Sequence, residues 1–167
     1  MTKLLIAILT TPCVLLLLGP ASAEARNIIS WGTMYAVDGP FLGSTNPIRG
    51  VNGDTEAWVL KKAEGHLTTK GKIEVEVKGL IFKDGDPNDE PTFKAVVSCL
   101  TESDGTTPVV NVATRGFPAT PSGNSKIDDK IELPNPCVAP IVFITGDDET
   151  IWFAVTGFEK EEKDEED

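Results

Sequence analysis

Nine residues in the middle of the chain have the composition of a metal-binding loop. The segment KDGDPNDEP, residues 83–91, places Asp84, Asp86 and Asn88 at alternate positions. Calcium loops begin with oxygen ligands at this spacing, but the helix-loop-helix type also needs glycine at the sixth position and glutamate at the twelfth. Counted from Asp84, those positions hold aspartate and alanine. Because the same residue types favour turns, the sequence predicts a solvated loop without metal, with a weak calcium site as the alternative. The turn GDDE, residues 146–149, has the same interpretation.

Other residues with catalytic potential are isolated in the sequence. His66 is the only histidine, which excludes the usual multi-histidine zinc sites. No G-x-S-x-G turn places a serine nucleophile, and no glycine-rich phosphate loop occurs. A pair of carboxylates could come from distant positions, but 26 acidic residues give no basis for choosing two. The sequence therefore predicts neither an enzyme nor a cofactor, and a carboxylate-dependent extracellular hydrolase is the alternative.

Four aromatic residues could form a platform on which a sugar ring stacks: Trp31, Tyr35, Trp58 and Trp152. Aromatic side chains in strands more often pack in the core. Trp152 is followed by Phe153, and neighbouring residues of a strand point to opposite faces, so one of the two is expected to face outward. Trp58 and Trp152 are accordingly the candidate platform residues.

The first 23 residues have the pattern of a cleaved secretory signal peptide. Lys3 precedes an apolar run at residues 4–18, and the small residues at 21–23 suit signal peptidase. The run is short for a membrane helix, which needs about 20 apolar residues. We expect a secreted protein without membrane attachment after cleavage, and Cys13 is removed with the signal.

Two cysteines remain after cleavage, Cys99 and Cys137. A pair of cysteines in an exported protein favours a disulfide bond. Two separate buried thiols are the alternative.

The mature chain is strongly acidic. Removal of 23 residues leaves 144, in which 14 basic residues face 26 acidic ones, a net charge of −12. Such a chain repels nucleic acid and anionic membranes, so any charged partner is expected to be cationic. The tail at residues 159–167 has seven acidic residues, two lysines and no apolar residue, and is predicted to be disordered.

The remaining sequence divides at residue 57. Residues 24–56 are predicted as an irregular lead-in rich in Gly, Asn and Pro, although IISWGTMYAV could form one strand. Residues 57–158 are predicted as one β domain. Ile73, Val75 and Val77 alternate with charged residues, which is typical of a strand with one buried face. TFKAVVSCL is apolar on both faces and is expected to be a central strand, whereas the charged SKIDDKIEL suits an edge.

Seven to eight short strands separated by turn signals predict an all-β, antiparallel sandwich that is immunoglobulin-like in broad architecture. Gly71 and the pair at residues 104–105 are expected to form hairpin turns. A true immunoglobulin domain has a tryptophan between its two cysteines. Here Trp58 precedes Cys99, so the prediction is limited to the sandwich.

Four stretches of the sequence resemble a group of small, mostly uncharacterised secreted proteins of bacteria. They are the strand FKAVVSCL, the FPATP loop, the LPNPCVAPIVF corner and the closing WFAVTGF, within residues 57–158. The resemblance implies a β-sandwich with a bridge between Cys99 and Cys137, and it implies no activity.

These features together predict a secreted, non-catalytic binding or structural module. Its partner is expected to be another extracellular protein or a cell-surface polymer. A hydrolase and a weak calcium-dependent, adhesin-like domain are the two alternatives.

Overall fold

The computed structural model describes residues 25–157, so the predicted signal peptide at 1–23 and the acidic tail at 159–167 lie outside it. Within this range the chain forms strands, one short 3-10 turn and no α-helix. None of the described segments is a helix long and apolar enough to cross a membrane. Eight strands have five or more residues. The elements in chain order are β1 (Asn27–Trp31), β2 (Tyr35–Ala36), η1 (Gly39–Phe41), β3 (Asn52–Gly53), β4 (Trp58–Val59), β5 (Lys62–Thr68), β6 (Lys72–Lys78), β7 (Ile81–Phe82), β8 (Thr92–Leu100), β9 (Val109–Ala113), β10 (Phe117–Pro118), β11 (Ser125–Lys130), β12 (Val138–Thr145) and β13 (Ile151–Val155).

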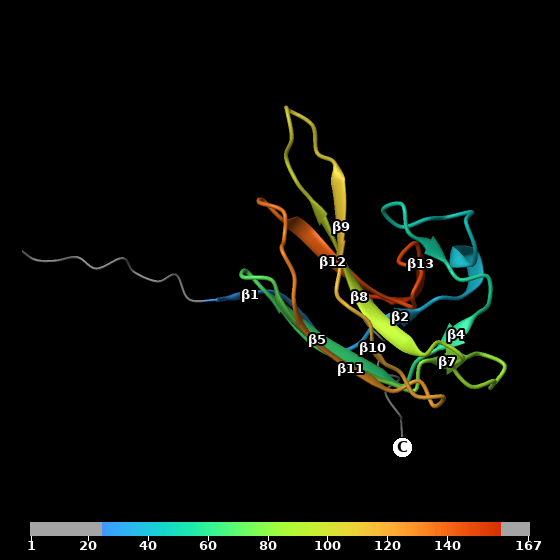
Figure 1. Ribbon diagram of the computed structural model, residues 1–167. Coiled ribbons are helices and arrows are strands. Elements are labelled where there is room, and N and C mark those ends of the chain that lie inside the picture. The colour runs from blue at the N-terminus through green and yellow to red at the C-terminus, as the bar shows by residue number, and fades with distance from the viewer. Residues whose placement is uncertain (1–24, 158–167) are drawn as a thin grey trace, which may run out of the picture.

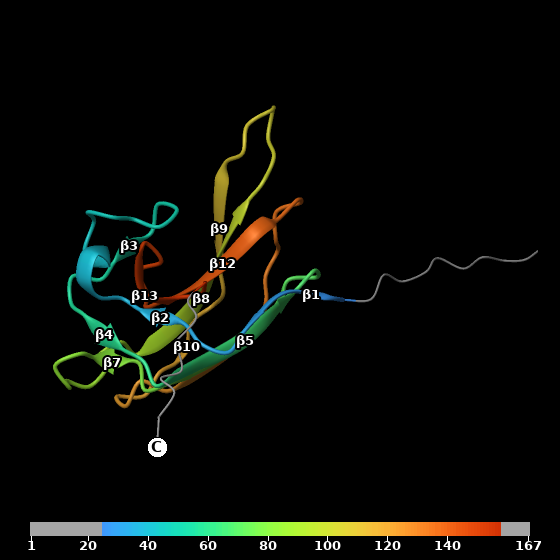
Figure 2. The ribbon, with the colours of Figure 1, turned by 180° about the vertical axis from the view of Figure 1, so that it is seen from behind.

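The strands form two main sheets, which Figures 1 and 2 show from opposite sides. The four-stranded sheet has the order β1-β5-β6-β11. The seven-stranded sheet has the order β10-β8-β12-β13-β2, with β9 also on β8 and β3 on β13. All pairs are antiparallel except β3–β13, and a small β4–β7 pair stands apart. The predicted all-β, mainly antiparallel fold is thus confirmed, and the sheets stay open.

The two sheets share one hydrophobic core. In β6, Ile73, Val75 and Val77 are each at most 1% exposed, while the charged residues between them face solvent. Phe93 and Ala95 of β8 are fully buried in the same cluster. The period-two pattern therefore identified the buried face of β6 correctly.

Strand β8 is buried on both faces, as predicted for a central strand. Val96 and Val97 point to opposite faces, yet both are at most 1% exposed. The strand pairs with β12 on one side and with β9 and β10 on the other. The four-stranded sheet covers one face, so a different part of the chain must cover the other.

The lead-in supplies that second cover, and it is more regular than the sequence suggests. Residues 27–36 form two strands in different sheets, because β1 pairs with β5 and β2 pairs with β13. The β domain therefore begins near Asn27, whereas the sequence placed its start at residue 57. The imperfect alternation of IISWGTMYAV has a physical reason: the chain passes from one sheet to the other after Trp31, so its buried face changes.

Arg49 fastens the lead-in to two strands of the seven-stranded sheet. Its Nη1 donates to the carbonyl oxygen of Ser98 at 2.9 Å, and its Nη2 donates to that of Ala139 at 2.8 Å. Because each donor reaches a different strand, β8 and β12, one guanidinium holds the lead-in against both.

Cys99 and Cys137 form the predicted disulfide bond, with Cα atoms 5.0 Å apart. The bond joins the end of β8 to the start of β12 across 38 residues of sequence. The corner before Cys137 contains a cis peptide bond between Asn135 and Pro136. A disulfide bond is compatible with an extracellular location.

The predicted turns and edge strand are also present. Gly71 has φ of +77° between β5 and β6, and Asp104 and Gly105 have φ of +49° and +75° between β8 and β9. A positive φ at both central residues is typical of a tight hairpin turn. Among the described strands, β11 pairs with β6 alone and forms one edge of its sheet.

Replacing both bridged cysteines by alanine should lower the free energy of unfolding substantially. A crosslink across 38 residues contributes about 4 kcal/mol through the entropy of the unfolded chain. Urea unfolding of the C99A/C137A variant should show this loss, and wild-type protein in reducing agent should behave like the variant. A loss below about 1 kcal/mol would show that the bond adds little to stability.

Candidate functional site

The loop with alternating oxygen ligands owes its shape to turn chemistry. Asp84 Oδ1 accepts a hydrogen bond from the backbone N–H of Asp86 at 3.0 Å, and Gly85 between them has φ of +99°. This is the local bond that aspartate makes in turns. Both carboxylates are exposed, so the loop lies at the surface between β7 and β8, as predicted.

Asn88 is not exposed beside these two aspartates as a further oxygen ligand, because its side chain is buried and hydrogen-bonded within the protein. Its Nδ2 donates to the carbonyl oxygens of Glu90, at 2.8 Å, and Thr120, at 3.0 Å. Its Oδ1 accepts from the backbone N–H of Glu90 at 3.1 Å. The carboxamide thus ties this loop to the FPATP loop, and its oxygen is engaged in that tie. Within residues 25–157, no three His, Cys, Asp or Glu side chains converge as a metal-binding group.

The proposed aromatic platform is wrong, because Trp58 and Trp152 lie in the core at 2% and 0% exposure. Trp58 stacks on Phe153 with ring centroids 4.4 Å apart and donates its indole N–H to Asp54 Oδ2 at 2.9 Å. Trp152 lies 6.2 Å from Phe41 in the lead-in.

The expectation that Trp152 or Phe153 faces outward is also wrong, because both are buried: Phe41 of the lead-in packs against Trp152, and Phe153 packs against Trp58. The other two aromatics of that set are only partly buried. Trp31 lies over the backbone of Gly65, and Tyr35 meets Phe41 edge-on at 5.8 Å.

His66 lies on the outer face of the four-stranded sheet, opposite Glu74 of β6. Lysines on the same strand neutralise the carboxylates there: Lys72 bonds Glu74, and Lys78 bonds Glu76. Hydrogen bonds from these lysines hold the pKa of both glutamates below the ordinary value. A hydrolase acid needs the opposite shift, so this face does not suit the catalytic alternative.

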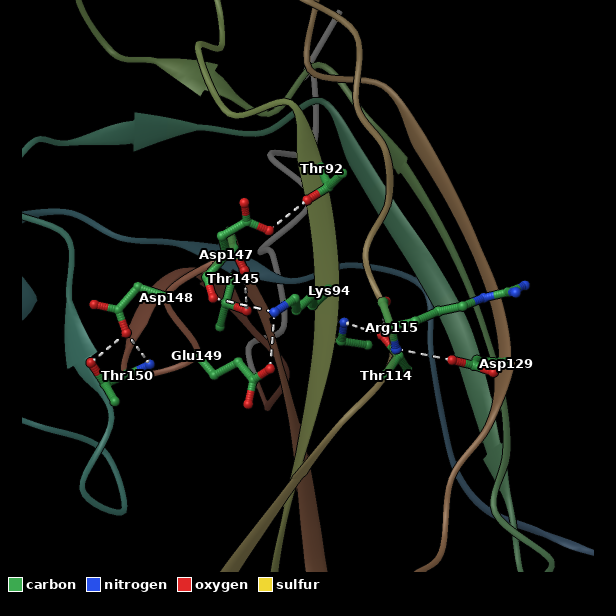
Figure 3. Close-up of polar contacts among 12 residues, drawn as sticks. Thr92, Lys94, Thr114, Arg115, Asp129, Thr145, Asp147, Asp148, Glu149 and Thr150 are labelled. Atoms are coloured by element: carbon green, nitrogen blue, oxygen red, sulfur yellow. Dashed lines mark hydrogen bonds and ion pairs between the residues drawn. The ribbon is translucent and has the colours of Figure 1, made fainter.

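A second polar group surrounds the turn between β12 and β13, shown in Figure 3. Lys94 of β8 donates to the backbone oxygen of Asp147 at 3.2 Å and to Glu149 Oε1 at 3.0 Å. Thr92 donates to Asp147 Oδ1 at 3.0 Å. Asp148 accepts two bonds from Thr150, which lower the pKa of this carboxyl. These contacts fix the turn against the start of β8.

On the other side of β8 in Figure 3, Asp129 joins the two sheets. Its Oδ2 accepts from the backbone N–H of Arg115 at 3.0 Å, and Arg115 lies between β9 and β10. The neighbouring Thr114 accepts from the backbone N–H of Ala95 at 3.0 Å. Asp129 interrupts the apolar row of β11, and this bond across the sheets is the physical reason.

Three connections gather carboxylates at one end of the molecule: the β3–β4 segment, the β7–β8 loop and the β12–β13 turn. Glu90 lies near Asp54, Asp89 and Asp147, and Glu56 lines the same surface depression as Asp84. We call this region the acidic end. Its carboxylates are Asp54, Glu56, Asp84, Asp86, Asp89, Glu90, Asp147, Asp148 and Glu149.

The pKa of Glu90 is raised by its burial and by the carboxylates around it. Burial raises its pKa above the ordinary value, and the negative charge of Asp89 raises it further. The backbone N–H of Asp147 opposes the shift by donating a hydrogen bond, although the charges of Asp147 and Asp54 add to it. This residue could not be singled out from the sequence, because the carboxylates around it come from three segments far apart along the chain.

Fold and contacts together define an all-β protein with one disulfide bond and a crowded, negatively charged loop end. No known family, no curated protein and no solved structure matches this chain. Function must therefore be inferred from the arrangement of its own residues.

Replacing Asn88 by alanine should destabilise the protein, whereas the same change at Asp86 should not. Asn88 makes three side-chain hydrogen bonds in a buried position, and their loss should cost about 2–3 kcal/mol. Asp86 is exposed, so D86A should change the free energy of unfolding by less than about 0.5 kcal/mol.

The same two variants test the calcium alternative. Thermal melts of wild type and D86A with and without millimolar calcium should agree, because no specific ligand then stabilises the folded state. A rise in the wild-type melting temperature with calcium, lost in D86A, would establish the metal site.

Replacing Glu90 by glutamine should stabilise the protein at neutral pH. A carboxyl whose pKa is raised on folding favours the folded state while protonated, and this contribution is lost as pH rises from the ordinary value through the raised one. The stability of wild type minus that of E90Q should therefore fall across that window. Chemical unfolding at a series of pH values checks this, and a difference independent of pH would contradict the assignment.

Proposed function

We propose that the protein is a secreted, non-catalytic binding module with an immunoglobulin-like β-sandwich. Its acidic end recognises a cationic region of another extracellular protein or of a cell-surface polymer. The two open antiparallel sheets with a shared core support the sandwich, and the signal-like first 23 residues with the disulfide bond support secretion. The resemblance to small secreted proteins is part of the same proposal.

The observation that carries this function is the charge imbalance of the acidic end. It gathers nine carboxylates, and two lysines of the same region are already paired, Lys83 with Asp38 and Lys94 with Glu149. Burial is the main cause of the raised pKa of Glu90, and the negative charges of Asp89, Asp147 and Asp54 add to it. A cationic partner would relieve this repulsion, and such a field also steers oppositely charged molecules during encounter.

The acidic end is also pre-organised. The Asn88 tie holds the β7–β8 loop, the indole N–H of Trp58 holds Asp54, and Lys94 holds the β12–β13 turn. Loops fixed before binding lose less conformational entropy on association, which favours affinity. A rigid scaffold that presents loops is the usual arrangement of binding modules.

The two alternative functions have less support from these contacts. The calcium-dependent adhesin would use Asn88 as a ligand, and its side-chain oxygen already accepts a backbone hydrogen bond. The hydrolase would use two carboxylates in a cleft, whereas Glu64, Glu74 and Glu76 on the outer face of the four-stranded sheet are each in an ion pair with a lysine of the same strand.

A charge-neutralisation experiment tests the proposed function. The probes are immobilised poly-lysine and chitosan, both cationic polymers, and the protein is the mature, disulfide-bonded chain. The variant E56Q/D86N/D89N removes three exposed carboxylates of the acidic end that make no side-chain hydrogen bond or ion pair among the described residues. Binding should fall several-fold, and raised salt should weaken wild-type binding because it screens exposed charges.

Two controls separate the acidic end from net charge and from the tail. The variant E64Q/D128N/E132Q makes the same change in net charge elsewhere on the surface and should retain binding. Deletion of residues 159–167 should also retain it. Equal losses in the two triple variants, or loss only on tail deletion, would refute recognition by the acidic end.

A further inference from the structure

Strand β9 is an exposed sheet edge without charge. It pairs with β8 alone among the described strands, and its five residues are Val, Val, Asn, Val and Ala. Figures 1 and 2 show it on the hairpin that extends beyond the four-stranded sheet. Its outer side thus offers unpaired backbone groups to another strand.

One edge of the four-stranded sheet, strand β11, is protected by charged side chains, in contrast to β9. Strand β11 contains Lys126, Asp128, Asp129 and Lys130 within six residues. Charged side chains of this kind prevent pairing with further strands. Because β9 has no charged side chain, a second strand could pair with it without burying or opposing a charge.

The sequence of β9 is close to self-complementary. In an antiparallel pair centred on Asn111, two copies of Asn111 face each other, Val110 of one copy faces Val112 of the other, and Val109 faces Ala113. Each pair combines residues of similar polarity. Valine pairs on one face of a sheet stabilise the pairing.

Charges at the two ends of β9 are complementary in the same arrangement. The register places Arg115 of one copy opposite Thr107 of the other, next to the turn that carries Glu102 and Asp104. None of these three charged residues forms an ion pair among the described residues, and the guanidinium of Arg115 lies over the Phe117 ring at 4.7 Å. Because the dimer would be two-fold symmetric, the attraction between Arg115 of one copy and the acidic residues of the other would occur twice.

Apolar side chains would also become continuous across the pair. In each chain Leu100 lies between Val138 and Val109, which are 52% and 41% exposed. Val96 lies between Ala113 and Phe143 in a second row. Because Val109 would face Ala113 of the other copy, the exposed row of one chain would continue into the buried row of the next.

We propose that this protein forms a homodimer in which two β9 strands pair antiparallel about a two-fold axis at Asn111. The dimer joins the two seven-stranded sheets into one. The inference is independent of the acidic end, whose loops belong to other connections.

Cysteine crosslinking tests the register. Directly opposed residues of an antiparallel pair have Cα atoms about 4.5–5.5 Å apart, within the range that a disulfide bond spans. Under mild oxidation the N111C variant should give a covalent dimer on a non-reducing gel. The matched control S30C places an exposed cysteine on β1, the uncharged edge of the other sheet, and should stay monomeric.

A charge exchange tests the interface independently of crosslinking. Sedimentation velocity of the wild type should show a dimer as concentration rises through the micromolar range. R115E should raise the dissociation constant roughly tenfold, because it opposes acidic residues, and E102R/R115E should restore most of the affinity. Circular dichroism should show the same fold in all variants.

A wild type that stays monomeric at every concentration, or N111C that crosslinks no faster than S30C, would overturn the dimer. Dimerisation unaffected by R115E would overturn this register. Capture of an extended peptide by β9 of a monomeric protein would assign the edge to a different partner and equally refute the proposal.

Discussion

The need to cover both faces of strand β8 governs the rest of the structure. A strand with apolar residues on both faces is stable only between two layers, since apolar surface left in water costs about 25 cal/mol per Å². The four-stranded sheet covers one face. The lead-in covers the other, and Arg49 holds it there through carbonyl groups of β8 and β12. The chain crosses early from β1, in the four-stranded sheet, to β2, in the seven-stranded sheet, and Phe41 further along the lead-in then packs against Trp152 of β13.

Local patterns predicted the strands well and their surroundings less well. The alternation at Ile73, Val75 and Val77 identified a buried face because period two is a property of one strand. The turns at Gly71 and at residues 104–105, the edge strand β11 and the disulfide bond also depend on local or compositional signals. By contrast, the burial of Trp152 depends on Phe41 of the lead-in, and the burial of Trp58 depends on Phe82 and Phe153; these partners are distant in sequence from the tryptophans that they cover. The acidic end was missed for a similar reason, since it combines three connections.

Several polar residues that could do chemistry serve instead as ties between segments. Asp54 accepts from the Trp58 indole, Asn88 joins two loops, and Asp129 joins β11 to the β9–β10 link. Each tie satisfies backbone or indole N–H groups that would otherwise be costly to bury. Their effect is to fix the loops, so that the carboxylates left at the surface keep a defined arrangement.

The disulfide bond closes a ring of chain that includes strands of both sheets: β9 and β10 belong to one, and β11 belongs to the other. The exposed turn at Asp104 and Gly105 is part of that ring. A protease that cuts this turn would therefore leave two fragments still joined by sulfur, each anchored in the sheets. Backbone cleavage at this position therefore need not separate the two halves of the protein, because the bond between Cys99 and Cys137 still joins them.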